Sequence, residues 1–238
     1  EKPLVTTLEE MDRVEQAAQQ HGVTIFEAFM FLHHPQTLKV KALIESGRIG
    51  ALQTIHGWFH FNLPPEDADN VRLQSSLAGG SAWDVFRYPN SMAIVMTGGA
   101  PPEAVWAQQL TGESGVDVGM RAQMRFAGDV TAQISSGFRT PFREGVWFVG
   151  SEGIMHVPQP WKPHERGTDS QITITNLDNS EETITFPLMD PYDCEVAAME
   201  ACVLDGAAPV VPLSLSRIFV RSILAMYVSA ASGAVVAP

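Results

Sequence analysis

Residues 79–89 read Gly-Gly-Ser-Ala-Trp-Asp-Val-Phe-Arg-Tyr-Pro, and this stretch guides the interpretation of the whole chain. The segment 80–97 has helical character despite Pro89, which belongs at a kink or in a first turn rather than inside an unbroken helix. Asp84 and Tyr88 are four residues apart, so a helix places them on one face, about one turn apart. The stretch therefore predicts a helix that carries an acid and a phenol together.

These two side chains fit either a chemical or a structural role. A tyrosine activated by a nearby lysine can take the hydroxyl proton when an alcohol loses a hydride. Lys2 is a lysine that could do this, because a partly desolvated amine can have a lowered pKa or act as a fixed cation. In the alternative, Asp84 caps the helix, Tyr88 packs in the core and Lys2 is solvated. Residue types alone favour this second interpretation.

The N-terminal third predicts two helices around a strand. Thr7 and Glu10 form a capping-box pattern, and apolar residues then recur at helical spacing. Residues 23–29 are a nearly unbroken apolar run, which predicts a strand buried on both faces of a parallel sheet. Pro35 is placed to begin a second helix.

The remainder of the chain predicts an extended sheet closed by helices. A long strand begins near residue 51 and ends at Pro64-Pro65. Strand-like segments with glycines between them fill residues 104–186 and predict a large, mostly antiparallel sheet. Residues 190–204 and 214–231 predict two closing helices. The fold class is therefore α+β, with helices flanking the sheet.

Composition excludes several classes of function. The net charge of −12 repels nucleic acid and anionic lipid, so we expect neither as a partner. Cys194 and Cys202 would lie roughly 12 Å apart on a helix, too far to pair, which fits a reducing compartment such as the cytoplasm. Both are expected in the core. The apolar stretch 218–236 is expected to be a buried helix rather than a membrane span.

The histidines do not predict a metal site. His56 and His60 share a strand face but would be roughly 13 Å apart, too far for one ion. The remaining histidines lack further ligands at useful spacing. We therefore expect no bound metal.

Four motifs in order carry a resemblance to a known family. They are Glu1-Lys2-Pro3, the stretch 27–36 (Glu-Ala-Phe-Met-Phe-Leu-His-His-Pro-Gln), the turn 47–50 (Gly-Arg-Ile-Gly) and the stretch 79–89. Together they resemble the Gfo/Idh/MocA family of nicotinamide-dependent sugar and diol oxidoreductases. Within it, the chain is most similar to the dihydrodiol and xylose dehydrogenase branch. The similarity covers essentially the whole chain.

The resemblance implies a domain division and a set of site residues. Residues 1–34 would be a remnant of the dinucleotide-binding Rossmann domain, and residues 35–238 the C-terminal substrate-binding and oligomerisation domain. The resemblance implies that Lys2 and Tyr88 form a catalytic pair, which Asp84 assists. It implies that Glu1, Lys2 and Pro3 contact the cofactor. It also implies that the rings of Phe59 and Trp161 line the substrate site. Ordinary core packing remains an equal alternative for the two rings.

The sequence also departs from the family. Phe86-Arg87 replaces a small pair, often Gly-Cys, and puts bulk next to the expected cofactor face. Leu32 stands where relatives often carry arginine. The glycine-rich turn GxGxxG that binds a dinucleotide is absent, so we expect this chain alone to bind NAD or NADP weakly or not at all, and to be inactive as a fragment.

Two classes of function follow. The first is an NAD(P)-dependent oxidoreductase that moves hydride between a nicotinamide and a sugar, polyol or trans-diol. The second is a truncated, non-catalytic relative that serves as a ligand-binding or oligomerisation module. In either case we expect a homo-oligomer through the sheet face, because strands within residues 104–138 are rich in apolar residues.

Overall fold

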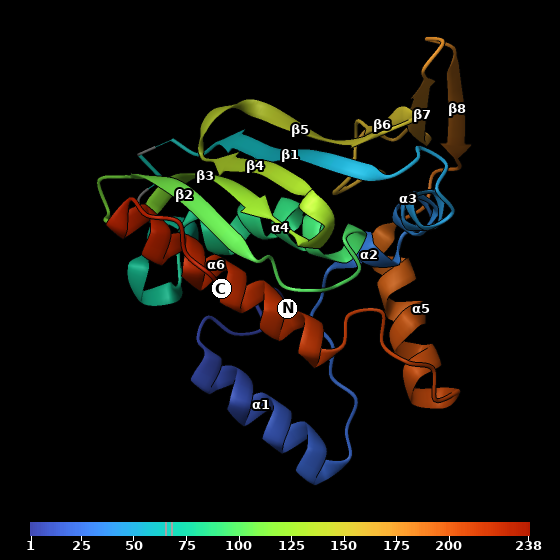
Figure 1. Cartoon of the computed structure of the whole chain (residues 1–238). Coiled ribbons are helices and arrows are strands. Elements are labelled where there is room, and N and C mark those ends of the chain that lie inside the picture. Colours follow the sequence, from blue (N-terminus) through green and yellow to red (C-terminus); the bar gives the residue numbers. More distant parts are fainter. Residues whose placement is uncertain (65, 68) are drawn as a thin grey trace.

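The computed structural model describes residues 1–64, 66–67 and 69–238, which form an α+β fold around one large sheet (Figure 1). The predicted long strand is confirmed, but it ends at Asn62, before Pro64; Pro65 lies outside the described residues. The strands are β1 (Leu52–Asn62), β2 (Ala104–Thr111), β3 (Asp117–Arg125), β4 (Thr131–Gly137), β5 (Arg139–Gly150), β6 (Gly153–Val157), β7 (Ser170–Asn176) and β8 (Glu181–Phe186).

The sheet has the strand order β2-β3-β4-β1-β5-β6-β7-β8. The pair β1–β4 is parallel and every other neighbouring pair is antiparallel, so the predicted mostly antiparallel sheet is confirmed. Side chains alternate across β1, where Ile55, Gly57 and Phe59 face the core. This face of the sheet is the one that the helices cover.

The predicted helices begin where their capping residues place them. Thr7 makes both halves of a capping box with Glu10, and the His34 ring accepts a hydrogen bond from the Gln36 amide just before the helix that starts at Pro35. The helices are α1 (Leu8–His21), α2 (Met30–His33), α3 (Pro35–Glu45), η1 (Val71–Leu73), η2 (Ser75–Leu77), η3 (Ala82–Phe86), α4 (Arg87–Met96), η4 (Ala127–Asp129), α5 (Pro191–Leu204) and α6 (Leu213–Ser232).

The strand predicted at residues 23–29 is wrong. In the described residues this segment pairs with no strand and runs as irregular chain between α1 and α2. A strand exists only with a hydrogen-bonding neighbour, and an apolar run alone does not supply one. Burial is also confined to the C-terminal part of the segment, because Phe29 is fully buried whereas Val23 is 53% exposed.

The segment that carries Asp84 and Tyr88 lies directly beneath the sheet. It begins as one π-helical stretch, η3, and continues as α4, so Pro89 falls in the first turn of α4, as predicted. Pro89 packs closely on Gly57 of β1, where an added Cβ would come within 3.1 Å of the proline Cβ. Glycine at position 57 therefore lets the helix approach the sheet.

The C-terminal helix α6 covers the same face beside α4 (Figure 1). It is long and apolar enough to cross a membrane, and 44% of its most apolar window is buried inside the protein. Ser229 on this helix accepts a hydrogen bond from the Ala107 amide of β2 at 2.9 Å. These contacts agree with the prediction of a buried helix.

One arginine joins the N-terminal helix to this layer. Arg217 of α6 binds Asp12 and Glu15 of α1, with its closest contacts at 2.6 and 2.7 Å. The two cysteines lie on α5 and are free. Cys202 is buried as expected, but Cys194 is only half-buried, so its assignment to the core is wrong.

A buried aspartate fixes the start of η3. Asp117 on β3 accepts hydrogen bonds from Ser81 Oγ at 2.7 Å, the Ala82 amide at 2.8 Å and the Tyr227 hydroxyl at 2.6 Å. Gly80 precedes this cluster with φ +118°, and an added Cβ would lie 2.3 Å from Asp117 Oδ1. Position 80 therefore requires glycine for its backbone angle and for space.

A second buried carboxylate belongs to Glu144 on β5, opposite Phe59 of β1. Its side chain is 3% exposed, and the nearest cation in the described residues is Arg166, with N and O atoms 3.9 Å apart. Burial raises the pKa of Glu144 to about 7, although Arg166 and the Trp161 amide oppose this. The carboxyl is therefore about half protonated at neutral pH, where an ordinary glutamate is ionised.

We predict that Gly80→Ala destabilises the fold more than Gly98→Ala does. Both glycines have positive φ, which costs about 1–2 kcal/mol for alanine, but only at position 80 does the Cβ meet other atoms. The clash adds about 1–3 kcal/mol. Thermal unfolding of both variants checks this, and equal melting temperatures would contradict it.

We predict that Glu144→Gln removes part of the pH dependence of stability. The pKa is raised in the folded state, so the stabilisation is complete below the unfolded value and is lost as pH rises through about 7. Ionised Glu144 then costs on the order of 3 kcal/mol. The variant should therefore melt several degrees higher than the wild type at pH 8. Glu181→Gln, exposed on β8, is the control and should leave the profile unchanged.

Candidate active site

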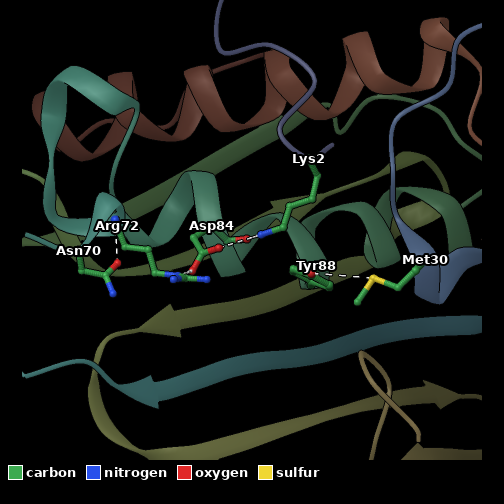
Figure 2. Close-up of polar contacts among 6 residues, drawn as sticks. All are labelled: Lys2, Met30, Asn70, Arg72, Asp84 and Tyr88. Carbon is green, nitrogen blue, oxygen red and sulfur yellow. Dashed lines mark hydrogen bonds and ion pairs between the residues drawn. The ribbon is translucent and has the colours of Figure 1, made fainter. Parts of the chain in front are cut away.

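Lys2 and Asp84 form an ion pair although they are 82 residues apart in sequence (Figure 2). Lys2 Nζ lies 2.8 Å from Asp84 Oδ1 and donates a second hydrogen bond to the Asp84 backbone carbonyl at 2.6 Å. Lys2 comes from the segment before α1, and Asp84 from the middle of η3. Both side chains are largely buried, at 15% and 16% exposure.

Tyr88 lies beside this pair and presents the face of its ring. Lys2 Nζ is 4.9 Å from the ring centroid, which is the distance of a cation–π contact. The Tyr88 hydroxyl points toward Met30 Sδ at 4.0 Å (Figure 2). In the described residues the hydroxyl makes no hydrogen bond to Lys2 or Asp84. The structure therefore brings all three predicted residues together, with the lysine on the ring rather than on the phenol oxygen.

A fourth residue, which the sequence did not single out, completes the cluster. Arg72 of η1 donates from Nε to Asp84 Oδ2 at 2.5 Å. Asp84 is therefore bound by a cation on each carboxylate oxygen. A lone arginine in a polar loop after a strand gives no pattern that distinguishes it from a solvated side chain.

The surroundings change the proton affinities of Lys2 and Tyr88 in opposite directions. Burial lowers the pKa of Lys2, the ion pair with Asp84 opposes this, and the positive charges of Arg87 and Arg72 lower the pKa further. Burial raises the pKa of Tyr88 above its usual value, with smaller contributions from Tyr192 and Asp84. The phenol therefore stays protonated at neutral pH, and the amine holds its proton less tightly than a solvated lysine does.

Aromatic rings enclose Tyr88, which is 5% exposed. The centroid of the Phe59 ring is 5.3 Å away and that of Trp161 is 5.8 Å away, both edge to face. Trp161 is fully buried and donates from Nε1 to the Trp58 carbonyl at 3.1 Å. Both predicted rings therefore border the candidate site and are packed as core residues within this chain.

A buried ion pair joins the irregular segment before α2 to the start of α4. Arg87 and Glu27 are both fully buried and bind each other, and Glu27 Oε1 also accepts a hydrogen bond from the Leu4 amide at 3.1 Å. Phe86 is fully buried too. Both side chains lie in the core of this chain, and the expectation that residues 86–87 put bulk next to a cofactor stays a prediction.

The remaining predicted cofactor contacts are Glu1, which is exposed, and Pro3, which is half-buried. In residues 1–64, 66–67 and 69–238 no GxGxxG turn begins a helix. Gly79 and Gly80 precede η3, but the Ala82 amide at its start donates to Asp117. Gly98 and Gly99 follow the end of α4, and the residues 150–153 connect β5 to β6. The described residues therefore do not fit the pyrophosphate of a dinucleotide, whose usual site is a helix N-terminus.

For metals, no group of three or more His, Cys, Asp or Glu side chains in the described part of the chain could hold an ion. His60, one of the two histidines on β1, forms a hydrogen bond with Ser135 at 3.0 Å.

Comparison with known proteins agrees with the fold and with the resemblance. The family described as GFO/IDH/MocA C-terminal domain matches residues 37–156. D-xylose 1-dehydrogenase (NADP(+)) 2 of Haloferax volcanii is 32% identical over 237 residues, which cover 99% of this chain and 71% of that protein. Trans-1,2-dihydrobenzene-1,2-diol dehydrogenase of Danio rerio is 26% identical, over 81% of this chain and 54% of its own length.

A solved structure has the same architecture. The 3-ketoreductase of Actinomadura kijaniata, in complex with NADP and TDP-benzene, superimposes with a TM-score of 0.86 at 26% identity, over 96% of this chain and 69% of that one. The same reductase was also solved with one tyrosine replaced by phenylalanine and with one lysine replaced by alanine. This chain thus spans between about half and about 70% of the length of these relatives, and it belongs to the Gfo/Idh/MocA family of oxidoreductases.

Proposed function

We propose that this chain supplies the proton-transfer and substrate-binding part of an NAD(P)-dependent oxidoreductase that acts on a sugar, a polyol or a trans-diol. The observation that carries the proposal is the contact of Lys2 with both Asp84 and the ring of Tyr88 inside a largely buried site. In an oxidoreductase of this kind a hydroxyl proton must move as hydride leaves the same carbon. A lysine, an acid and a phenol provide groups for that proton.

Each residue has a role that follows from its surroundings. The Tyr88 phenol is protonated at neutral pH and donates its proton to the substrate oxygen that gains negative charge as hydride reaches the carbon. Lys2 is the cation that stabilises negative charge on that oxygen. Asp84 orients Lys2 and keeps it charged. Phe59 and Trp161 provide the apolar wall against which a sugar or diol ring packs.

The cofactor would be NAD or NADP, which supplies or accepts the hydride when bound. We propose that residues 1–34 belong to a dinucleotide-binding part and that residues 35–238 form the substrate domain, with Glu1, Lys2 and Pro3 at the cofactor end. The NADP in the names of the xylose dehydrogenase and of the solved reductase supports a nicotinamide cofactor without choosing between the two. Two free cysteines fit a cytoplasmic location.

A non-catalytic role as a ligand-binding or oligomerisation module is the second candidate. Two observations favour it: the Tyr88 hydroxyl points to Met30, and the described residues hold no turn for a pyrophosphate. Turnover separates the two candidates, because only the first requires Tyr88 and Lys2 to be chemically competent.

We predict that Tyr88→Phe and Lys2→Ala each lower turnover by roughly 10²–10⁴-fold, because each removes a group that transfers or stabilises a proton. The assay follows NADH and NADPH absorbance with aldoses, polyols and trans-diols, using the protein expressed from its natural reading frame. Val23→Ala, an exposed position away from the site, is the control. Wild-type turnover in both site variants would refute the assigned roles, and no turnover in any form would favour the non-catalytic module.

We also propose a homo-oligomer through the open face of the sheet, on grounds that differ from those of the sequence. The apolar residues of β2 to β4 face the helices, whereas the outward residues are mostly polar, such as Arg121, Gln123 and Gln133. Tryptophans supply the apolar surface instead. Trp58, Trp106 and Trp147 line a groove of about 520 Å³ on this face.

We predict a dimeric mass for the wild type in light scattering at micromolar concentration, and a monomeric mass for Trp106→Glu. Trp106 of the edge strand β2 is 39% exposed and lines this groove, so a charge there would be desolvated on association. The matched control is Leu177→Glu, an exposed apolar residue between β7 and β8, which should stay dimeric. A monomeric wild type would refute the proposal.

A further inference from the structure

Arg72 lies in the short helix η1, whose backbone is held by several hydrogen bonds. The Asn70 side chain accepts a hydrogen bond from the Arg72 amide at 3.1 Å, and the Gly80 amide donates to the Arg72 carbonyl at 2.8 Å. Gly79 lies against the same carbonyl, where an added Cβ would come within 2.7 Å of the Arg72 oxygen. The glycines that precede Asp84 therefore have separate structural tasks. Gly79 fits beneath Arg72, and Gly80 fits beneath Asp117.

The Arg72 guanidinium and the Lys2 amine each bind one oxygen of the Asp84 carboxylate. Oδ2 accepts from Arg72 Nε at 2.5 Å, and Oδ1 accepts from Lys2 Nζ at 2.8 Å (Figure 2). The Arg72 guanidinium also lies over the Phe61 ring of β1 at 5.9 Å. Its side chain is 41% exposed, whereas Asp84 is 16% exposed. The largely buried Asp84 carboxylate thus lies between two cations. The more exposed cation, Arg72, is held by hydrogen bonds to its backbone and by the contact of its guanidinium with the Phe61 ring.

Such an arrangement has two physical consequences. A carboxylate with both oxygens bound has one favoured rotamer, so the contact at Oδ2 keeps Oδ1 aimed at Lys2. The second cation also cancels part of the negative charge that Lys2 experiences, because the site as a whole holds two positive groups and one negative group. Arg72 therefore acts on Lys2 through Asp84 and through space.

We propose that Arg72 is a positioning residue of this site, which holds Asp84 toward Lys2 and offsets the charge of that carboxylate. Its importance for catalysis rests on the function proposed above. Its effect on Lys2 does not, because that effect is a property of the folded chain.

The charges around Lys2 set the sign of the expected effect. Asp84 of η3 raises the pKa of Lys2, whereas Arg72 of η1 and Arg87 of α4 lower it. Tyr88 of α4 faces Lys2 as a neutral phenol. Elsewhere in the neighbourhood, Arg87 is bound to Glu27, and Glu195 of α5 lies near Glu1. Removal of the Arg72 charge with Asp84 still held in place should therefore raise the pKa of Lys2, whereas loss of the hold on Asp84 would lower it.

The test is a titration of Lys2 in the chain itself. The sequence has four lysines, Lys2, Lys39, Lys41 and Lys162, so reductive methylation with a carbon-13 label gives a small set of NMR signals. Lys2→Arg assigns the signal. In Arg72→Gln, whose amide can still donate to Asp84 without a charge, the Lys2 midpoint should move to higher pH. Arg72→Lys keeps the charge and should return the midpoint toward that of the wild type.

Two further variants keep the result interpretable. Asp84→Asn should move the midpoint in the opposite direction, to lower pH, because it removes the only carboxylate in contact with the amine in the described residues. Arg125→Gln, which removes an exposed arginine paired with Glu103, should leave it unchanged. Circular dichroism confirms that each variant is folded. An Arg72→Gln midpoint that is unchanged or lower overturns the proposal.

This readout separates the two proposals. A raised Lys2 midpoint without turnover in any form would support the role of Arg72 in the site and refute the oxidoreductase. Turnover that depends on Tyr88 and Lys2, together with an unchanged midpoint, would overturn only the role of Arg72. Where turnover is present, the pH–rate profile of Arg72→Gln should shift upward along with the Lys2 midpoint.

Discussion

The carboxylate of Glu27 joins parts of the chain that would otherwise be independent. It binds the Leu4 amide, two residues after Lys2, and the guanidinium of Arg87, the residue before Tyr88. The position of the lysine relative to the tyrosine thus depends on one fully buried ion pair. Such a pair contributes little to net stability compared with apolar residues of equal size, but loss of one partner leaves a buried charge that costs about 3–5 kcal/mol. Geometry, more than stability, is what this pair provides.

The aromatic surroundings of Tyr88 complete this geometry. Burial keeps the phenol protonated and its ring fixed against Phe59, Phe31 and Trp161. Lys2 then approaches the electron-rich face of the ring rather than the hydroxyl, so the two groups interact without sharing a proton. The site is organised around Asp84, which receives the charge of Lys2 on one side and that of Arg72 on the other.

Local signals predicted local structure well. The capping box at Thr7, the proline at position 35 and the alternation along residues 52–62 each act within a few residues, and the structure has the expected element at each. The run at residues 23–29 failed because a strand depends on a partner that the run itself does not encode. Cys194 failed for a related reason, since half of α5 faces away from the core.

The site was predictable only where motifs are shared with a family. Lys2, Asp84 and Tyr88 came from that resemblance, and their mutual contact agrees with it. Arg72 and the Glu27–Arg87 pair are contacts across 12 and 60 residues, made by single side chains without a repeating pattern. Nothing in spacing or composition distinguishes them, because burial and charge pairing arise only after the chain has folded.

The single parallel pairing in the sheet has a consequence for the order in which the protein folds. Thr54 of β1 lies opposite Thr131 of β4, so this pairing closes a loop of more than seventy residues that contains η1, η3, α4, β2 and β3. Closing a loop of that length costs chain entropy before any contact compensates for it, which slows folding. Arg72, Asp84 and Tyr88 all lie inside that loop. Lys2 lies outside the loop and meets Asp84 across 82 residues, so the complete cluster of charges depends on a second long-range closure in addition to that of the sheet.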